Sequence, residues 1–236
     1  MGVKIEEHST RAKHMTGAKN SRPARLLITG FGPFPRIPVN ASSRLALAIG
    51  RQARARMPDV EVTVSRLTTS WRAAPLELER LLVRLDPDIA LHFGVSSGAL
   101  GFLLETVARN EADGSPDALG GLPGTARLAA DGPAKRRSTF PARQILARLH
   151  ELQLPASISR DAGRYLCNAT LYRSLELAAT ARRRRLTGFI HIPTSFADAS
   201  GSASSLHRLT FQNAVAGGLA IVAVCHAHAT AEFQAA

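Results

Sequence analysis

From residue 25 onward, short apolar segments typical of buried strands alternate with longer segments that have the period of an amphipathic helix. Alternation of this kind predicts an α/β sheet with helices on both faces. The predicted strands are Leu26–Thr29, Val60–Leu67, Asp88–Phe93, Leu103–Ala108, Ala156–Ser159 and Thr187–Ile192, with a helix as the alternative over Leu103–Ala108. The predicted helices are Ser42–Arg56, Ala73–Leu85, Pro141–Leu152, Cys167–Arg182 and Leu206–His226. We therefore predict a single α/β domain built on a mixed, twisted sheet.

The limits of this domain follow from composition. Residues 1–24 lack apolar periodicity and carry several basic side chains, so we predict a disordered basic tail there and a folded domain over residues 25–236. Residues 113–135 are rich in Gly, Pro and Ala, which predicts a long irregular excursion. Loops of this length inside a domain are usually functional or mobile.

The two cysteines, Cys167 and Cys225, do not indicate a disulfide framework. No run of about 18 apolar residues is present, and the N-terminus has no apolar stretch of the signal-peptide type. We expect a cytoplasmic protein with reduced thiols. Cys225 follows an apolar segment and is expected to be a buried small hydrophobe.

The net charge of +12 favours a different kind of function. Two basic clusters, Lys135–Arg137 and Arg182–Arg185, could bind a nucleic acid or an acidic partner. Aromatic residues are 5% of the chain and do not interleave with these arginines, so no stacking platform for single strands is visible. We interpret the clusters as a solvated surface and expect no nucleic-acid partner. A non-enzymatic nucleic-acid-binding protein remains an alternative hypothesis.

Cys167 is placed where a thiol can become a nucleophile. It opens a predicted helix, directly after a glycine-containing segment. A helix N-terminus offers unpaired N–H groups and partial positive charge that favour a thiolate. His191 lies near the end of a predicted apolar strand, and an imidazole there could take the proton and later return it to a leaving group.

Four further segments of the chain form an ordered set of motifs. They are Thr29–Phe34 with Asn40 and Ser42, Gly94–Gly98 followed by Leu104–Asn110, Ala162–Asn168, and Phe189–Pro193. Together they resemble the motifs of the pyroglutamyl peptidase I family, also called pyrrolidone-carboxylate peptidases. The resemblance runs from about Leu26 to the predicted C-terminal helix.

The resemblance implies roles for particular residues. Cys167 is the expected nucleophile, His191 the general base and acid, and Glu105 the carboxylate that orients the imidazole. The expected substrate-binding residues are Phe31, Phe34, Gly94 and Val95. The two phenyl rings would hold a small neutral ring, and main-chain groups of the Gly94–Gly98 loop would line it.

The same resemblance implies a phosphorylase/hydrolase-like fold and removal of N-terminal pyroglutamate from peptides through a thioester. It implies no metal and no organic cofactor, and a homodimer or homotetramer. Asn110, which ends the second motif, is expected to hold a loop by hydrogen bonds. The chain departs from the family pattern at Pro35, Ala99 and Thr106, and after Asn110 it lacks an expected arginine.

A serine hydrolase is the second enzymatic hypothesis. Gly94–Gly98 satisfies the pattern G-x-S-x-G after an apolar strand, so Ser96 could be the nucleophile of a strand–turn–helix elbow. The remaining members would be Asp161 or Asp131, and His191 or His207. This hypothesis leaves the sequence around Cys167 unexplained.

Overall fold

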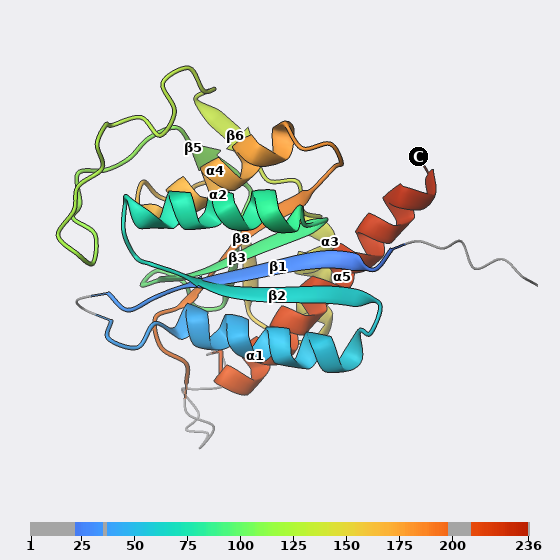
Figure 1. Cartoon of the computed structure of the whole chain (residues 1–236). Coiled ribbons are helices and arrows are strands. Elements are labelled where there is room, and N and C mark those ends of the chain that lie inside the picture. Colours follow the sequence, from blue (N-terminus) through green and yellow to red (C-terminus); the bar gives the residue numbers. More distant parts are fainter. Residues whose placement is uncertain (1–21, 35–36, 198–208, 236) are drawn as a thin grey trace, which may run out of the picture.

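The computed structural model describes residues 22–34, 37–197 and 209–235. A six-stranded sheet lies between two layers of helices (Figure 1). The order across this sheet is β2-β1-β3-β8-β4-β7, in which the first four strands are parallel and β4 and β7 run the opposite way. The strands are β1 (Ala24–Phe31), β2 (Val60–Leu67), β3 (Ile89–Ser96), β4 (Phe102–Glu105), β7 (Ala156–Ser159) and β8 (Leu186–Pro193). The predicted mixed sheet with helices on both faces is confirmed.

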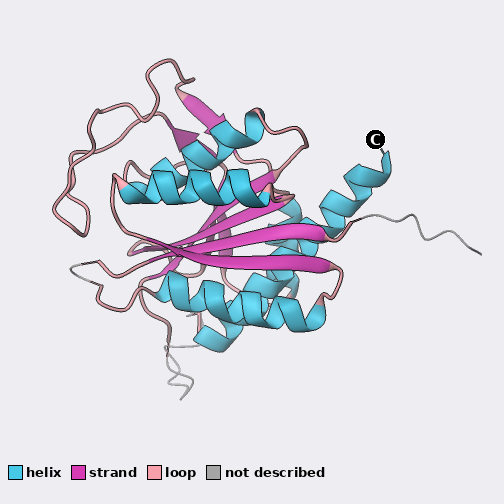
Figure 2. Ribbon diagram, viewed as in Figure 1, coloured by secondary structure: helices cyan, strands magenta, loops and turns pink. Residues whose placement is uncertain are grey.

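The two helix layers bury opposite faces of the sheet (Figure 2). Alternate strand residues point to opposite faces, so a strand that is covered on both sides is apolar at nearly every position. In β1, Leu26 and Ile28 join one core, whereas Leu27 and Phe31 join the other. The first core is closed by α1 (Ala41–Arg56), α3 (Ala142–Glu151) and α5 (Phe211–Ala235), and the second by α2 (Ala73–Leu85) and α4 (Leu166–Ala179).

Most element boundaries lie within a few residues of those predicted from the sequence. The bounds of β2, β7 and α2 are as predicted. The first strand is longer than predicted and begins at Ala24, inside the segment assigned to the tail, because Ala24 pairs with Val60 of β2 and its N–H donates to Asp59. Residues 1–21 of the predicted tail lie outside the described residues.

The prediction of one strand over Leu103–Ala108 is wrong, because two strands in different sheets share this segment. β4 belongs to the main sheet, whereas β5 (Val107–Arg109) pairs with β6 (Lys135–Arg137) in a separate two-stranded sheet. Thr106 sits at the crossover. Its N–H and its hydroxyl both donate to the carbonyl of Ser159, at 2.9 and 2.6 Å, and its own carbonyl accepts from Ser138. The chain therefore leaves the main sheet after Glu105.

The last helix differs from the predicted Leu206–His226. Residues 206–208 lie outside the described residues, and α5 runs from Phe211 to Ala235. By length and composition, Phe211–Ala231 could cross a membrane. Within this domain, however, Ala214, Ile221 and Val222 are buried in the core formed with α1 and α3, so α5 has the character of a core helix.

The predicted excursion is held to the domain by buried polar side chains. The Asn110 amide donates to the carbonyls of Ala129 and Gly132, and its oxygen accepts from the Ala129 N–H. The prediction that Asn110 holds a loop by hydrogen bonds is confirmed. Farther along, the Asp117 carboxylate accepts the N–H of Trp71, at the start of the α2 region, and so fastens the loop near the carboxyl end of the sheet.

Candidate active site

Glu105 and His191 meet because β4 and β8 are antiparallel neighbours. The register places Glu105 opposite Phe189, so His191 is the diagonal neighbour two residues along on the same face. Glu105 Oε1 lies 2.8 Å from His191 Nδ1. This contact leaves Nε2 of the ring available to a partner on the other side.

That partner is Cys167, the second residue of α4, which packs over this face of the sheet. Its thiol lies close enough to His191 for its charge and hydrogen-bonding capacity to act on the imidazole. Burial alone would lower the pKa of His191, but the negative charge of Cys167 and the hydrogen bonds to Cys167 and Glu105 outweigh burial and raise that pKa to about 10. The arrangement therefore favours a protonated imidazole beside Cys167.

Gly94 makes the approach of the thiol to the sheet sterically feasible. It is the register neighbour of His191 on the adjacent strand β3. A Cβ atom at Gly94 would lie 3.0 Å from Cys167 Sγ and 2.7 Å from Cζ of Phe189. Only a residue without a side chain leaves room there for both groups.

Glu105 is fully buried and has one partner for its two carboxylate oxygens. Oε1 bonds to His191, whereas Oε2 has no hydrogen-bond partner among the described residues. Its backbone carbonyl accepts the Ser138 hydroxyl at 2.7 Å, which fixes the strand end. A carboxylate enclosed in this way gains from a positively charged imidazole, since burial otherwise penalises its charge.

Asn168 fixes the start of α4 against the small sheet. It is completely buried, accepts the Arg109 N–H at 2.8 Å, and donates to the carbonyls of Arg109 and Glu111. Cys167 precedes it directly, so these three bonds determine where the thiol lies relative to β8. The Ala162–Asn168 motif thus contains a positioning residue whose role the sequence did not reveal.

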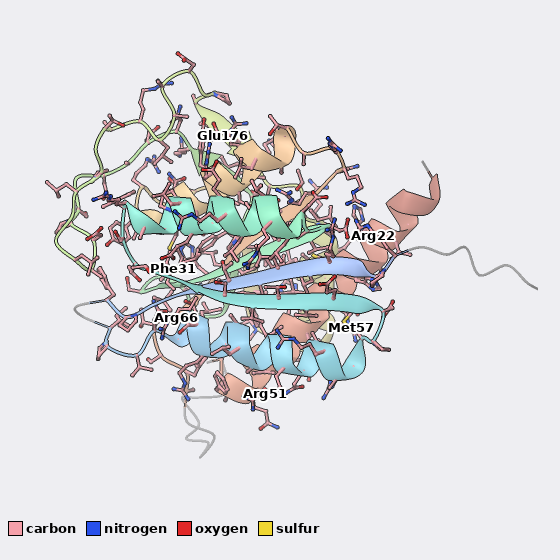
Figure 3. The ribbon with its side chains drawn as sticks, in the orientation of Figure 1. Arg22, Phe31, Arg51, Met57, Arg66 and Glu176 are labelled. Atoms are coloured by element: carbon pink, nitrogen blue, oxygen red, sulfur yellow. The ribbon has the colours of Figure 1, made fainter. Side chains whose placement is uncertain are left out.

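A pocket of about 210 Å³ opens beside Cys167. This volume is below the roughly 300–1,000 Å³ of clefts that hold drug-sized ligands. None of its lining residues is Asp, Glu, Lys, Arg or His: they are Phe31, Phe34, Ile37, Asn40, Thr69, Val95, Ser97, Tyr165, Leu166, Cys167 and Thr194. Figure 3 shows Phe31 at the carboxyl end of β1, whereas Arg22 lies just before the other end of that strand.

The pocket contains three of the four predicted substrate-binding residues. Phe31, Phe34 and Val95 line it, but Gly94 does not; Gly94 lies instead beneath the sulfur. Phe31 is also part of the core, 3% exposed and 6.4 Å from the Phe189 ring. Phe34 is half-buried and packs against the Tyr165 ring at 5.9 Å.

Sequence reasoning missed the aromatic wall at the mouth of the pocket. Tyr165 stacks edge-on with Trp71 at 5.2 Å and donates its hydroxyl to the carbonyl of Pro116 in the excursion. Burial, followed by nearby negative charges, raises the pKa of Tyr165 to about 12, so the hydroxyl stays protonated. The Trp71 indole N–H donates to the carbonyl of Ser115. The position of Tyr165, two residues before the cysteine, was the available sequence signal.

The serine-hydrolase hypothesis lacks its structural context. Ser96 ends β3, but the chain continues through a turn into β4 and not into a helix, so there is no nucleophile elbow. The Ser96 hydroxyl accepts the Gly98 N–H, and Asp161 pairs with Arg164. His207 lies outside the described residues.

The remaining predictions concern thiols and metals. Cys225 is fully buried, and burial raises the pKa of its thiol, as expected of a core residue. Across the described ranges, no cluster of three His, Cys, Asp or Glu side chains could hold a metal ion.

A thiol, an imidazole and a carboxylate in hydrogen-bonding order, carried by an α/β domain beside a small apolar pocket, form the arrangement of a cysteine peptidase. A family model described as pyroglutamyl peptidase matches residues 24–227. The chain therefore belongs to the pyroglutamyl peptidase family.

Individual relatives agree with this assignment. The pyrrolidone-carboxylate peptidase of Pyrococcus furiosus is 34% identical over 170 residues, which cover 72% of this chain and 80% of the relative. Pyrrolidone-carboxylate peptidase 1 of Ralstonia nicotianae is 33% identical, over 75% of this chain and 81% of that protein. The solved structure of the pyrrolidone carboxyl peptidase from Thermococcus litoralis superimposes with a TM-score of 0.78 at 25% identity, and covers 89% of this chain and 96% of its own.

Proposed function

We propose that this protein is a cysteine omega-peptidase that removes N-terminal pyroglutamate from peptides. Cys167 is the nucleophile, His191 the acid and base, and Glu105 the group that orients His191. The observation that carries the proposal is the placement of His191 between Glu105 and Cys167, beside a pocket lined by uncharged side chains.

The first half of the reaction forms a thioester. The Cys167 thiolate attacks the carbonyl carbon that joins pyroglutamate to the next residue, and the carbonyl oxygen becomes an oxyanion. Cys167 is the second residue of α4, so its N–H has no partner within the helix and is suited to stabilise this oxyanion. His191 then donates its proton to the nitrogen of the departing amine, and the C–N bond breaks.

The second half releases the product. His191, now neutral, takes a proton from water as the water oxygen attacks the thioester carbon. The C–S bond breaks, pyroglutamate leaves as the free acid, and the thiolate and imidazolium are restored. Through both halves Glu105 holds Nδ1 of the ring, so that Nε2 faces the reacting atoms.

The character of the pocket supports a pyroglutamyl substrate. A pyroglutamyl ring is a small neutral lactam without a free α-ammonium, so an enzyme that binds it needs no acidic anchor. No Asp or Glu lines this pocket, and Phe31, Phe34 and Val95 supply apolar surface for the ring. Ser97 and Thr194 also line the pocket, and their hydroxyls are suited to the polar edge of the lactam.

We further propose a cytoplasmic homodimer or homotetramer, which rests on the family resemblance and not on a contact within this chain. Light scattering coupled to size-exclusion chromatography tests the oligomer directly. A monomer at micromolar concentration would contradict it without affecting the chemistry proposed for the site.

The reaction is tested with pyroglutamyl-aminomethylcoumarin as substrate. We expect wild type to release the fluorophore and Cys167→Ser to be slower by at least about 10³-fold, because a serine is not ionised by this histidine. Cys225→Ser is the matched control, since that thiol is buried in the core among α1, α3 and α5 and should leave kcat unchanged in the folded fraction. Prolyl- and glutaminyl-aminomethylcoumarin, which carry a free amine, should not be cleaved.

Two further results bear on the assignment. Iodoacetamide should alkylate Cys167 and inactivate the enzyme, and a pyroglutamyl ligand should protect it. Equal activity of wild type and Cys167→Ser would overturn the proposal.

A further inference from the structure

The two basic clusters of the sequence, Lys135–Arg137 and Arg182–Arg185, contribute to one pocket. This pocket has a volume of about 310 Å³ and is formed by β6, the C-terminal end of α4 and the segment that leads into β8. Half of its lining residues are basic and none is acidic. The basic residues, together with one hydroxyl side chain, are Lys135, Arg136, Arg137, Arg184, Arg185 and Thr139.

Arg185 is the buried member of this set. Its side chain is 4% exposed, its Nε donates to the carbonyl of Pro87 at 3.0 Å, and its Nη2 lies 3.4 Å from Asp86. Nη1 is buried and has no hydrogen-bond partner among the described residues. Burial lowers the pKa of Arg185, although Asp86 and Asp88 oppose this effect. A buried N–H group without an acceptor is uncommon and points to a missing partner.

Arg136, in β6, repeats this pattern. Its side chain is 18% exposed, its Nη2 lies 3.3 Å from Glu176, and its guanidinium stacks over the Tyr172 ring at 4.9 Å. Figure 3 shows Glu176 on α4 next to β6. Nε of Arg136 is buried and has no hydrogen-bond partner in the described part of the chain. Stacking on Tyr172 holds the planar group in place, so its donors are already oriented.

This basic pocket is distinct from the candidate active site. Arg185 directly precedes β8, whereas His191 lies near the other end of that strand. Six residues of extended chain span ~20 Å. No residue lines both pockets.

We propose that the basic pocket binds a phosphate group, either as inorganic phosphate or carried by a small molecule. Guanidinium groups match phosphate oxygens in pairs, and several convergent donors suit a tetrahedral anion better than a single carboxylate. The phosphate would accept from Arg185 and Arg136, and the exposed Lys135 and Arg137 would complete its neutralisation. The volume is at the lower end of the range for small-molecule pockets, which suits a mononucleotide or a sugar phosphate.

The test is isothermal titration calorimetry of the full chain at constant ionic strength. The probes are inorganic phosphate, ATP, adenosine and an oligodeoxythymidine. The diagnostic variant is Lys135→Gln/Arg137→Gln, which removes two exposed cations from the pocket and spares the buried arginines. The control is Arg51→Gln/Arg56→Gln, which removes the same charge from the exposed face of α1, on the other side of the sheet (Figure 3 labels Arg51).

We expect saturable one-site binding of phosphate or ATP, and no binding of adenosine. The Lys135/Arg137 variant should raise Kd about tenfold or more, and the Arg51/Arg56 variant should change it by less than about twofold. A phosphate Kd equal to that of ATP identifies the free anion as the ligand, and tighter ATP binding identifies a carried phosphate.

Three results would overturn the proposal. The first is no saturation by phosphate or ATP up to about 10 mM. The second is an unchanged Kd in the Lys135/Arg137 variant, with thermal unfolding showing that it is folded. The third is that the oligodeoxythymidine binds more tightly than ATP and both double variants weaken it equally, because this is the behaviour of a diffuse basic surface.

Discussion

Gly94→Ala tests whether the positions of the Cys167 sulfur and the His191 imidazole depend on the absence of a side chain at residue 94. The new Cβ would lie 2.7 Å from Cζ and 2.9 Å from Cε1 of Phe189, and 3.0 Å from Cys167 Sγ. Comfortable carbon contacts are about 3.5–4.0 Å, so the Phe189 ring must retreat by roughly 1 Å. Phe189 packs against the His191 ring at 4.9 Å, and its movement therefore disturbs the histidine as well.

The expected magnitudes follow from this geometry. Overpacking a core site costs about 1–3 kcal/mol of unfolding free energy. For a chain of this size each kcal/mol lowers Tm by about 2–4 °C. A displacement of about 1 Å at the reacting groups can reduce the rate roughly 100-fold. We expect kcat for pyroglutamyl-aminomethylcoumarin to fall by about 10- to 100-fold, with a smaller change in KM because Gly94 does not line the pocket.

Gly98→Ala is the matched control, two turn residues beyond the end of the same strand. A Cβ there would meet only the Ser96 hydroxyl, at 3.8 Å, which is an ordinary contact. It should leave kcat and Tm close to wild type. The reasoning fails if Gly94→Ala is as active and as stable as wild type, or if the two alanine variants lose activity to the same extent.

Three other substitutions probe the surroundings of the site. Cys167→Ala should lower the pKa of His191 from about 10, as measured by NMR titration, because burial then acts against less opposing charge. An unchanged value near 10 would assign the shift to Glu105. Because the pKa of His191 is raised in the folded state, its contribution to wild-type stability is complete below pH 6.5 and is lost as the pH rises through about 10. Urea titrations at a series of pH values should show this loss. Glu105→Gln should reduce kcat by roughly 10²–10⁴-fold, since the imidazolium loses its counter-charge; a decrease below threefold would contradict the orienting role. Asn168→Ala leaves three backbone groups without their hydrogen-bond partners, and each such group costs about 1–3 kcal/mol when it stays buried. Tm should therefore fall by at least about 4 °C. The control is Asn213→Ala, which changes an exposed side chain and should leave Tm unchanged.

The secondary structure was largely predictable because it depends on local patterns. Val60–Leu67 alternates as a strand, and Ala73–Leu85 repeats as a helix, and both have the predicted bounds. The exception is Leu103–Ala108, where periodicity continues through a point at which the chain changes sheets. The bonds that cause this change come from Ser138 and Ser159, which are distant in the sequence.

The site was predictable only as a set of residues. The motifs indicated Cys167, His191 and Glu105, but they could not indicate that Glu105 is the diagonal neighbour of His191, because strand register is not written in either segment. For the same reason Gly94 was expected to line the pocket for the substrate ring, whereas it lies under the sulfur of Cys167. The aromatic wall of Tyr165 and Trp71 joins segments that no local pattern connects.

The sequence by itself determined the alternation of strands and helices, the nucleophile at a helix start and the family motifs, since each depends on neighbours within a few turns of chain. Only the tertiary structure decided which side chains share a face and which polar groups remain without partners. It brought two arginine-rich segments to one pocket, and it left N–H groups of Arg185 and Arg136 buried without a hydrogen-bond partner among the described residues. Burial and contact are properties of the packed chain, and for this reason they could not be derived from the residues alone.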